Sequence, residues 1–168
     1  MGQGARREFT LTRRRKTSRF VVEIVNVGRE IPEGKAVGDR SRDWLHQSIR
    51  DLDHARSSRQ EGRHEWACFA AHQSAEKAVK ALHLAHGQEA WGHVIATLLR
   101  ELPTDPSPDM VEKAKVLDNF YIPTRYPNGH PDGAPFEHYG PIQSEQAISY
   151  AGEILEFVRV QMAGPSDS

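Results

Sequence analysis

The sequence EWACFAAHQSAEKAVKALHLA, residues 65–85, carries the strongest structural signal in this chain. Its apolar side chains recur every three or four residues, which places them on one face of an α-helix. Many of them are alanines, which allow a neighbouring helix to approach closely. Gly87 then offers a residue that readily adopts the left-handed conformation found at helix ends. The stretch predicts a long, closely packed helix over about Glu65–Ala85.

The same periodicity predicts four further helices, each marked by a capping residue or closed by a proline. The first of these helices begins at Ser41, and the second spans about His93–Leu102. The third begins at Ser107–Pro108 and ends before Pro123, and the last begins at Ser144–Glu145. The connections are short and the helical region has no strand pattern. We therefore predict an all-α fold, an antiparallel up-and-down bundle of four to five helices.

Charge divides the chain into unequal parts. Its 168 residues suffice for one domain with a hydrophobic core. Residues 1–40 are rich in arginine, have no periodicity and carry a net charge of +5, whereas residues 41–168 carry −6. We predict a basic, disordered N-terminal arm or a mis-assigned start over 1–40, a helical domain over 41–163 and a loose tail over 164–168. An arm that binds nucleic acid is the alternative for the first segment.

The single cysteine, Cys68, lies within the apolar helical pattern. One cysteine excludes an intrachain disulfide framework and fits a reducing, cytoplasmic compartment. We expect Cys68 to be a small buried core residue rather than a nucleophile. No apolar run reaches the length of a transmembrane helix, so no association with a membrane is expected.

The chemically versatile residues are concentrated in the proline- and glycine-rich loop of residues 123–139. Arg125 and His130 are separated there by four residues. A guanidinium suits a phosphate, and an imidazole exchanges protons near neutral pH. Together they could cleave RNA without a metal, one removing the 2′-hydroxyl proton and the other stabilising the phosphate. The alternative is that Arg125 caps the preceding helix and His130 is a turn residue.

A polar stripe runs along the helix of residues 65–85. The side chains of His72, Glu76, Lys80 and His83 share one helix face by their spacing. The stripe is either a wall of a cleft, with Glu76 orienting a loop residue, or a solvated surface with a Glu76–Lys80 ion pair. The chain has nine histidines but no recognisable metal-binding motif, so neither a metal nor a cofactor is expected.

Three separated motifs resemble those of a known family. They are DWL (43–45) with DLDHA (51–55), WACFAAHQSAEKAVKAL (66–82) and YIPTRYP (121–127), in this order. On these residues the chain resembles HEPN domains over about Ser41–Met162. The resemblance implies a helical bundle that forms a homodimer.

The resemblance also implies an activity. Small prokaryotic HEPN proteins are often paired with a minimal nucleotidyltransferase as toxin and antitoxin. Ribonuclease members carry an arginine and a histidine separated by a short spacer, and in those members the two side chains of both protomers line one cleft. Arg125 and His130 match this motif, so the expectation is a toxin-type, metal-independent endoribonuclease with these two catalytic residues. The expected supporting residues are Glu76, Tyr126, Lys80 and His72.

A noncatalytic module is the alternative. Tyr126 directly follows Arg125, where active members often carry Asn, Asp or His. Such a module would bind a nucleotide or dock a nucleotidyltransferase.

Overall fold

The computed structural model describes residues 40–164, and every regular element in this part of the chain is helical. The main helices are α1 (Ser41–Gln60), α2 (His64–Ala85), α3 (Ile95–Arg100), α4 (Pro108–Asp118) and α6 (Pro141–Ala163). The connection from α4 to α6 contains a 3-10 turn, η1 (Pro127–Gly129), and the one-turn helix α5 (Pro135–His138). The predicted all-α bundle is confirmed. The predictions for the N-terminal arm (1–40) and the C-terminal tail (164–168) lie outside the described residues, except for one residue of each, Arg40 and Gly164.

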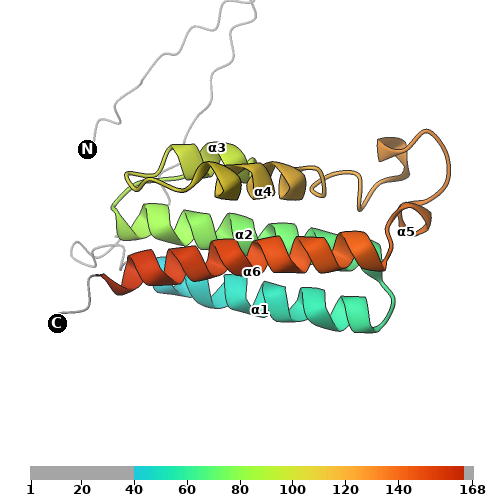
Figure 1. The fold of residues 1–168 in the computed structure, drawn as a ribbon, viewed down its shortest axis with the longest axis horizontal. Coiled ribbons are helices and arrows are strands. Elements are labelled where there is room, and N and C mark those ends of the chain that lie inside the picture. The colour runs from blue at the N-terminus through green and yellow to red at the C-terminus, as the bar shows by residue number, and fades with distance from the viewer. Residues whose placement is uncertain (1–39, 165–168) are drawn as a thin grey trace, which may run out of the picture. The chain divides into compact units, whose positions relative to one another are not determined.

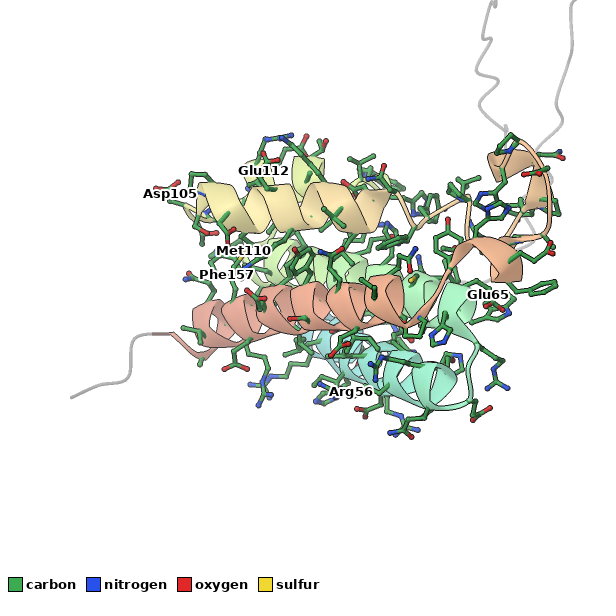
Figure 2. All side chains as sticks on the ribbon, turned by 45° about the vertical axis from the view of Figure 1, so that its right-hand side comes forward. Arg56, Glu65, Asp105, Met110, Glu112 and Phe157 are labelled. Atoms are coloured by element: carbon green, nitrogen blue, oxygen red, sulfur yellow. The ribbon has the colours of Figure 1, made fainter. Side chains whose placement is uncertain are left out.

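Helix α2 is the centre of the bundle. It packs against α1 and α6, and it also contacts α3 and α4 (Figure 1). Met110 of α4 and Phe157 of α6 lie between these two helices (Figure 2), packed against the core. The loop with η1 and α5 lies at the end of the bundle where α2 and α6 begin (Figure 1). No helix within residues 40–164 is long and apolar enough to cross a membrane.

The composition of α2 explains its central position. Small buried side chains on several of its faces let helices approach from more than one direction. The fully buried positions of α2 are Ala67, Cys68, Ala71, Ser74, Ala75, Ala78, Val79 and Ala81, together with His72. Burial raises the pKa of the Cys68 thiol to about 12, so the thiol stays protonated as a core residue, as predicted.

Two residues that the sequence pattern assigned to apolar faces are exposed instead. Trp66 is 45% exposed and Val94 is 53% exposed. Both lie where a helix begins, Trp66 in the first turn of α2 and Val94 at the N-cap of α3. Fewer neighbouring elements cover a helix at its end than in its middle, which accounts for the exposure.

The helix ends agree with the sequence signals in some places only. Gly87 adopts φ 70° after α2, and the amides of Gly87 and Gln88 bond back to the carbonyls of Leu84 and His83, as in a Schellman motif. Helix α6, however, begins at Pro141 rather than at Ser144. Pro141 takes the first helical position and the Gln143 side chain accepts the amide of Gly140 at 3.0 Å.

The other boundary corrections are smaller. Ser41 is the first residue of α1 and Arg40 is the N-cap, without a side-chain cap. Helix α3 is shorter than expected, and α4 ends at Asp118 rather than near Pro123. A turn follows Asp118, and Thr124 closes it by donating from its hydroxyl to the carbonyl of Phe120 at 2.6 Å.

Ser107 caps α4 as predicted, accepting the amide of Met110 at 3.2 Å. We expect Ser107→Ala to lower the free energy of unfolding by about 1 kcal/mol, because the amide loses its partner. Urea denaturation followed by circular dichroism measures the change. Ser149→Ala, an exposed serine within α6, is the matched control and should cost nothing, because alanine favours a helix interior. An equal loss in both variants would show that the hydroxyl does not cap the helix.

Candidate functional site

Arg125 lies in the turn after α4 with its side chain fixed in place. Its Nε donates to the carbonyl oxygen of Tyr121 at 2.9 Å. Its guanidinium carbon lies 4.5 Å from the ring centre of Phe69, 4.9 Å from Tyr121 and 5.1 Å from Tyr126. Within residues 40–164 no carboxylate pairs with it. The positive charge is therefore held by rings and one carbonyl, without being neutralised.

His130 has a separate set of partners. Its Nε2 donates to the carbonyl of Pro123 at 2.8 Å, and its ring stacks on His138 with centres 4.0 Å apart. The Nε2 of His138 donates to the carbonyl of Asp132 at 2.7 Å. A carbonyl only accepts hydrogen bonds, so Nε2 carries the hydrogen in both rings. In each neutral ring Nδ1 is therefore the nitrogen that can accept a proton.

Gly129 allows the loop to hold His130 in this position. A Cβ on Gly129 would lie 2.7 Å from the Cα of Pro123, a backbone atom that cannot easily move aside. Only glycine therefore lets residues 127–130 fold back onto Pro123. Arg125 and His130 lie on the same turn in consequence, but in the described part of the chain no hydrogen bond or ring contact joins them. A shared groove for the two side chains stays a prediction.

The second group of polar residues surrounds Glu76 of α2, whose side chain is only 6% exposed. Its carboxylate accepts hydrogen bonds from Lys80 Nζ at 2.9 Å, His93 Nδ1 at 3.0 Å and Gln73 Nε2 at 3.3 Å. Burial acts to raise the pKa of Glu76, but the hydrogen bond and charge of Lys80 and the bond from His93 outweigh burial and lower it. Glu76 is therefore a carboxylate at neutral pH.

His72 is fully buried beside Glu76. Its Nε2 donates to the carbonyl of His93 at 3.2 Å, and its Nδ1 accepts from Gln73 at 3.3 Å. Burial lowers the pKa of His72 to about 4, so the ring is neutral at pH 7. The stripe is thus not a solvated surface, because α2 is covered by other helices on this side and His83 is buried as well.

Tyr121 connects the two groups. Its ring stacks on His72, with centres 5.0 Å apart, and on His93 at 4.7 Å, and it also contacts the guanidinium of Arg125. Sequence reasoning named neither Tyr121 nor His93 as a site residue. Tyr121 begins the motif that contains Arg125, which is a usable signal. His93 lies 17 positions from Glu76 and only folding brings the two together.

Asp118 positions the segment that carries His93. Its carboxylate accepts the amides of Ile95 at 2.6 Å and Ala96 at 3.1 Å, so it caps α3 from the end of α4. Burial raises the pKa of Asp118.

Lys80, the remaining supporting residue of the sequence analysis, lies 5.8 Å from the ring centre of Trp44 and pairs with Glu76. Among residues 40–164 no three His, Cys, Asp or Glu side chains are placed to hold a metal ion.

Comparison with known families agrees with these motifs. The model of the HEPN domain family matches residues 41–161. The chain belongs to the HEPN family. The match covers α1 to nearly the end of α6, so the whole described bundle is the HEPN domain. None of the curated proteins matches this chain.

Solved structures are similar to this HEPN domain along nearly their whole length. The protein TT1696 from Thermus thermophilus is 52% identical with a TM-score of 0.72, and ST0689, an archaeal HEPN homologue, is 41% identical with a TM-score of 0.65. An HEPN domain protein from Thermotoga maritima is 30% identical with a TM-score of 0.61. Each alignment covers 73% of this chain and 98% of the other.

Proposed function

We propose that this HEPN protein binds RNA, with Arg125 as the receptor for a backbone phosphate. The observation that carries the proposal is a fixed guanidinium without an acidic partner among the described residues. The contact to Tyr121 uses Nε, so the two terminal nitrogens keep their hydrogens for a ligand. A planar pair of donors matches two oxygens of a phosphate. The surrounding rings already restrict the side chain, so little conformational entropy is lost on binding.

The exposed ring beside Arg125 favours a nucleic acid over other anions. Tyr126 is 51% exposed, and Ile122 next to the same turn is 47% exposed. Proteins that bind single-stranded nucleic acid combine a cation for the backbone with an aromatic ring on which a base stacks. Arg125 and Tyr126 supply both elements side by side.

Replacement of Arg125 tests the proposal. We expect Arg125→Gln to weaken binding of a labelled single-stranded oligoribonucleotide roughly tenfold to a hundredfold, measured by fluorescence anisotropy, because charge-assisted hydrogen bonds are lost. Arg125→Lys should restore binding only in part, since an ammonium lacks the planar pair of donors.

Arg159→Gln, an exposed arginine of α6, is the matched control and should bind like the wild type. Unchanged affinity of Arg125→Gln would refute the proposal. An equal loss in both arginine variants would indicate general attraction between charges instead of a site.

RNA cleavage is the second candidate function, and it is favoured by the Nδ1 of His130, which has no hydrogen-bond partner among the described residues. With Nε2 bound to Pro123, this nitrogen could take the proton of a 2′-hydroxyl while Arg125 stabilises the phosphate. The two side chains have separate partners in one chain, and the family resemblance implies that the arginines and histidines of two protomers would line one cleft. Phe136 and Ile142, exposed by 66% and 81% near this loop, favour the expected homodimer. The RNA from the binding assay, run on a denaturing gel, shows whether it has been cut.

The toxin role and the pairing with a minimal nucleotidyltransferase remain proposals from the family resemblance. A binding module of the alternative kind would use the same Arg125 for the phosphates of a nucleotide. Binding of RNA and docking of a partner protein are two different proposals. The contacts of Arg125 support the binding of RNA.

A further inference from the structure

His93, in the connection between α2 and α3, is held from three directions. Its Nδ1 donates to Oε1 of Glu76 at 3.0 Å. Its backbone carbonyl accepts Nε2 of His72 at 3.2 Å. Its ring stacks on Tyr121 with the ring planes 20° apart. Two of these contacts hold the ring itself, which nevertheless remains 52% exposed.

The second ring nitrogen of His93, Nε2, has no hydrogen-bond partner within the described residues. The hydrogen bond of this ring to Glu76 is made by Nδ1. The carboxylate of Glu76 fixes the tautomer and the orientation of the ring, as carboxylates behind functional histidines do. His93 therefore presents one exposed nitrogen in a fixed direction, as a residue that contacts a ligand would.

His93, which carries the exposed Nε2, lies against the same tyrosine ring as Arg125. Both side chains lie against Tyr121, His93 with ring centres 4.7 Å apart and Arg125 with its guanidinium carbon 4.9 Å from the ring centre. The two groups therefore lie around one tyrosine ring, where neighbouring groups of one ligand could reach both. In RNA the group that adjoins the phosphate is the ribose.

The charges around His93 favour a hydroxyl over a second phosphate. The carboxylate of Glu76 lies directly behind the ring, and Asp118 lies 3.8 Å from the neighbouring His72 ring. The positive charge of Lys80 is already paired with Glu76, so the second carboxylate, that of Asp118, disfavours an additional anion here. A hydroxyl is neutral, and it can donate to Nε2, which is the accepting nitrogen because Glu76 holds the hydrogen on Nδ1.

We propose that His93, oriented by Glu76, contacts the ribose 2′-hydroxyl next to the phosphate bound by Arg125 and makes the site selective for RNA over DNA. The inference rests on the proposed function. The 2′-hydroxyl is the group that lets a protein distinguish the two nucleic acids. Arg125 supplies affinity for either backbone, and His93 supplies the preference for ribose.

The test compares two single-stranded oligonucleotides of one sequence, one of RNA and one of DNA. We expect the wild type to bind the RNA roughly twofold to tenfold more tightly, the range of one net hydrogen bond. In His93→Phe the ratio of the affinity for RNA to the affinity for DNA should fall to about one, because the RNA binds more weakly while the binding of DNA is unchanged. Phenylalanine keeps a ring against Tyr121 and removes only the nitrogens. Arg125→Gln should weaken both ligands equally and leave the ratio unchanged.

The outcomes separate the two proposals. The role of His93 is overturned if the wild type binds RNA and DNA equally, or if His93→Phe prefers RNA as strongly as the wild type does. Either result leaves the role of Arg125 intact. Unchanged affinities in Arg125→Gln overturn the proposed function itself. If His93→Phe fails to fold, the NMR signals of the His93 ring in the wild type serve instead. They should shift on addition of RNA and stay in place with DNA, and equal responses to both would overturn the inference.

Discussion

Leu82→Ala is expected to lower the free energy of unfolding by about 2–5 kcal/mol, the range for a large buried residue that leaves a cavity. Leu82 is 1% exposed in α2 and belongs to the hydrophobic core that α2 forms with α1, α3, α4 and α6. Helices that contact α2 on several sides cannot all move inward to fill the space. Chemical denaturation followed by circular dichroism measures the loss.

Leu84→Ala is the matched control for this prediction. It is the same substitution in the same helix, two positions further, where the side chain is only half-buried. Its cost should be clearly smaller, since less apolar area leaves water on folding. Equal losses in the two variants would mean that α2 is not covered as the structure shows.

The free energy of unfolding is expected to depend on pH through the titration of His72. Burial lowers its folded-state pKa to about 4 from an ordinary value of 6.5, so between these values the unfolded chain binds a proton that the folded chain does not. The stabilising contribution is complete above pH 6.5 and is lost as the pH falls towards 4. At about 1.4 kcal/mol for each pH unit, the total loss is about 3 kcal/mol.

His72→Gln isolates this effect. An amide can donate to the carbonyl of His93 as the imidazole does, but it does not titrate. The free energy of unfolding, measured by urea denaturation at steps from pH 7 to 4.5, should fall less steeply in the variant than in the wild type. Glu76, whose pKa is lowered, adds a loss in the same direction only below its ordinary pKa of 4.5. Parallel curves for both proteins above pH 4.5 would show that His72 is not buried as a neutral ring.

Much of the bundle could be predicted because its signals are local. The periodicity of residues 65–85, the left-handed Gly87 and the Ser107 cap each depend on neighbours within about one helical turn. The start of α6 was predicted at the wrong residue because two local signals compete there. Ser144 looks like an N-cap by its type, but the glycine and proline before it already begin the helix.

The surroundings of the polar residues were less predictable. The spacing of His72 and Glu76 showed that they share a helix face, but it could not show whether another helix covers that face. In the structure Glu76 both pairs with Lys80 and accepts a hydrogen bond from His93 in the connection after α2, and its place in the wall of a cleft stays a prediction. Arg125 was found from its motif, whereas its contact with Phe69 of α2 depends on how the turn after α4 folds back.

The amino-acid order by itself determined the helices, the caps at Gly87 and Ser107, the HEPN family and Arg125 as a candidate residue. Only the tertiary structure decided that Glu76, His93, Tyr121 and Arg125 form one connected group. The physical reason is distance along the chain. Helix formation is governed by residues three or four positions apart, whereas this group is assembled by packing α3, α4 and the turn after α4 onto α2, which local patterns do not encode.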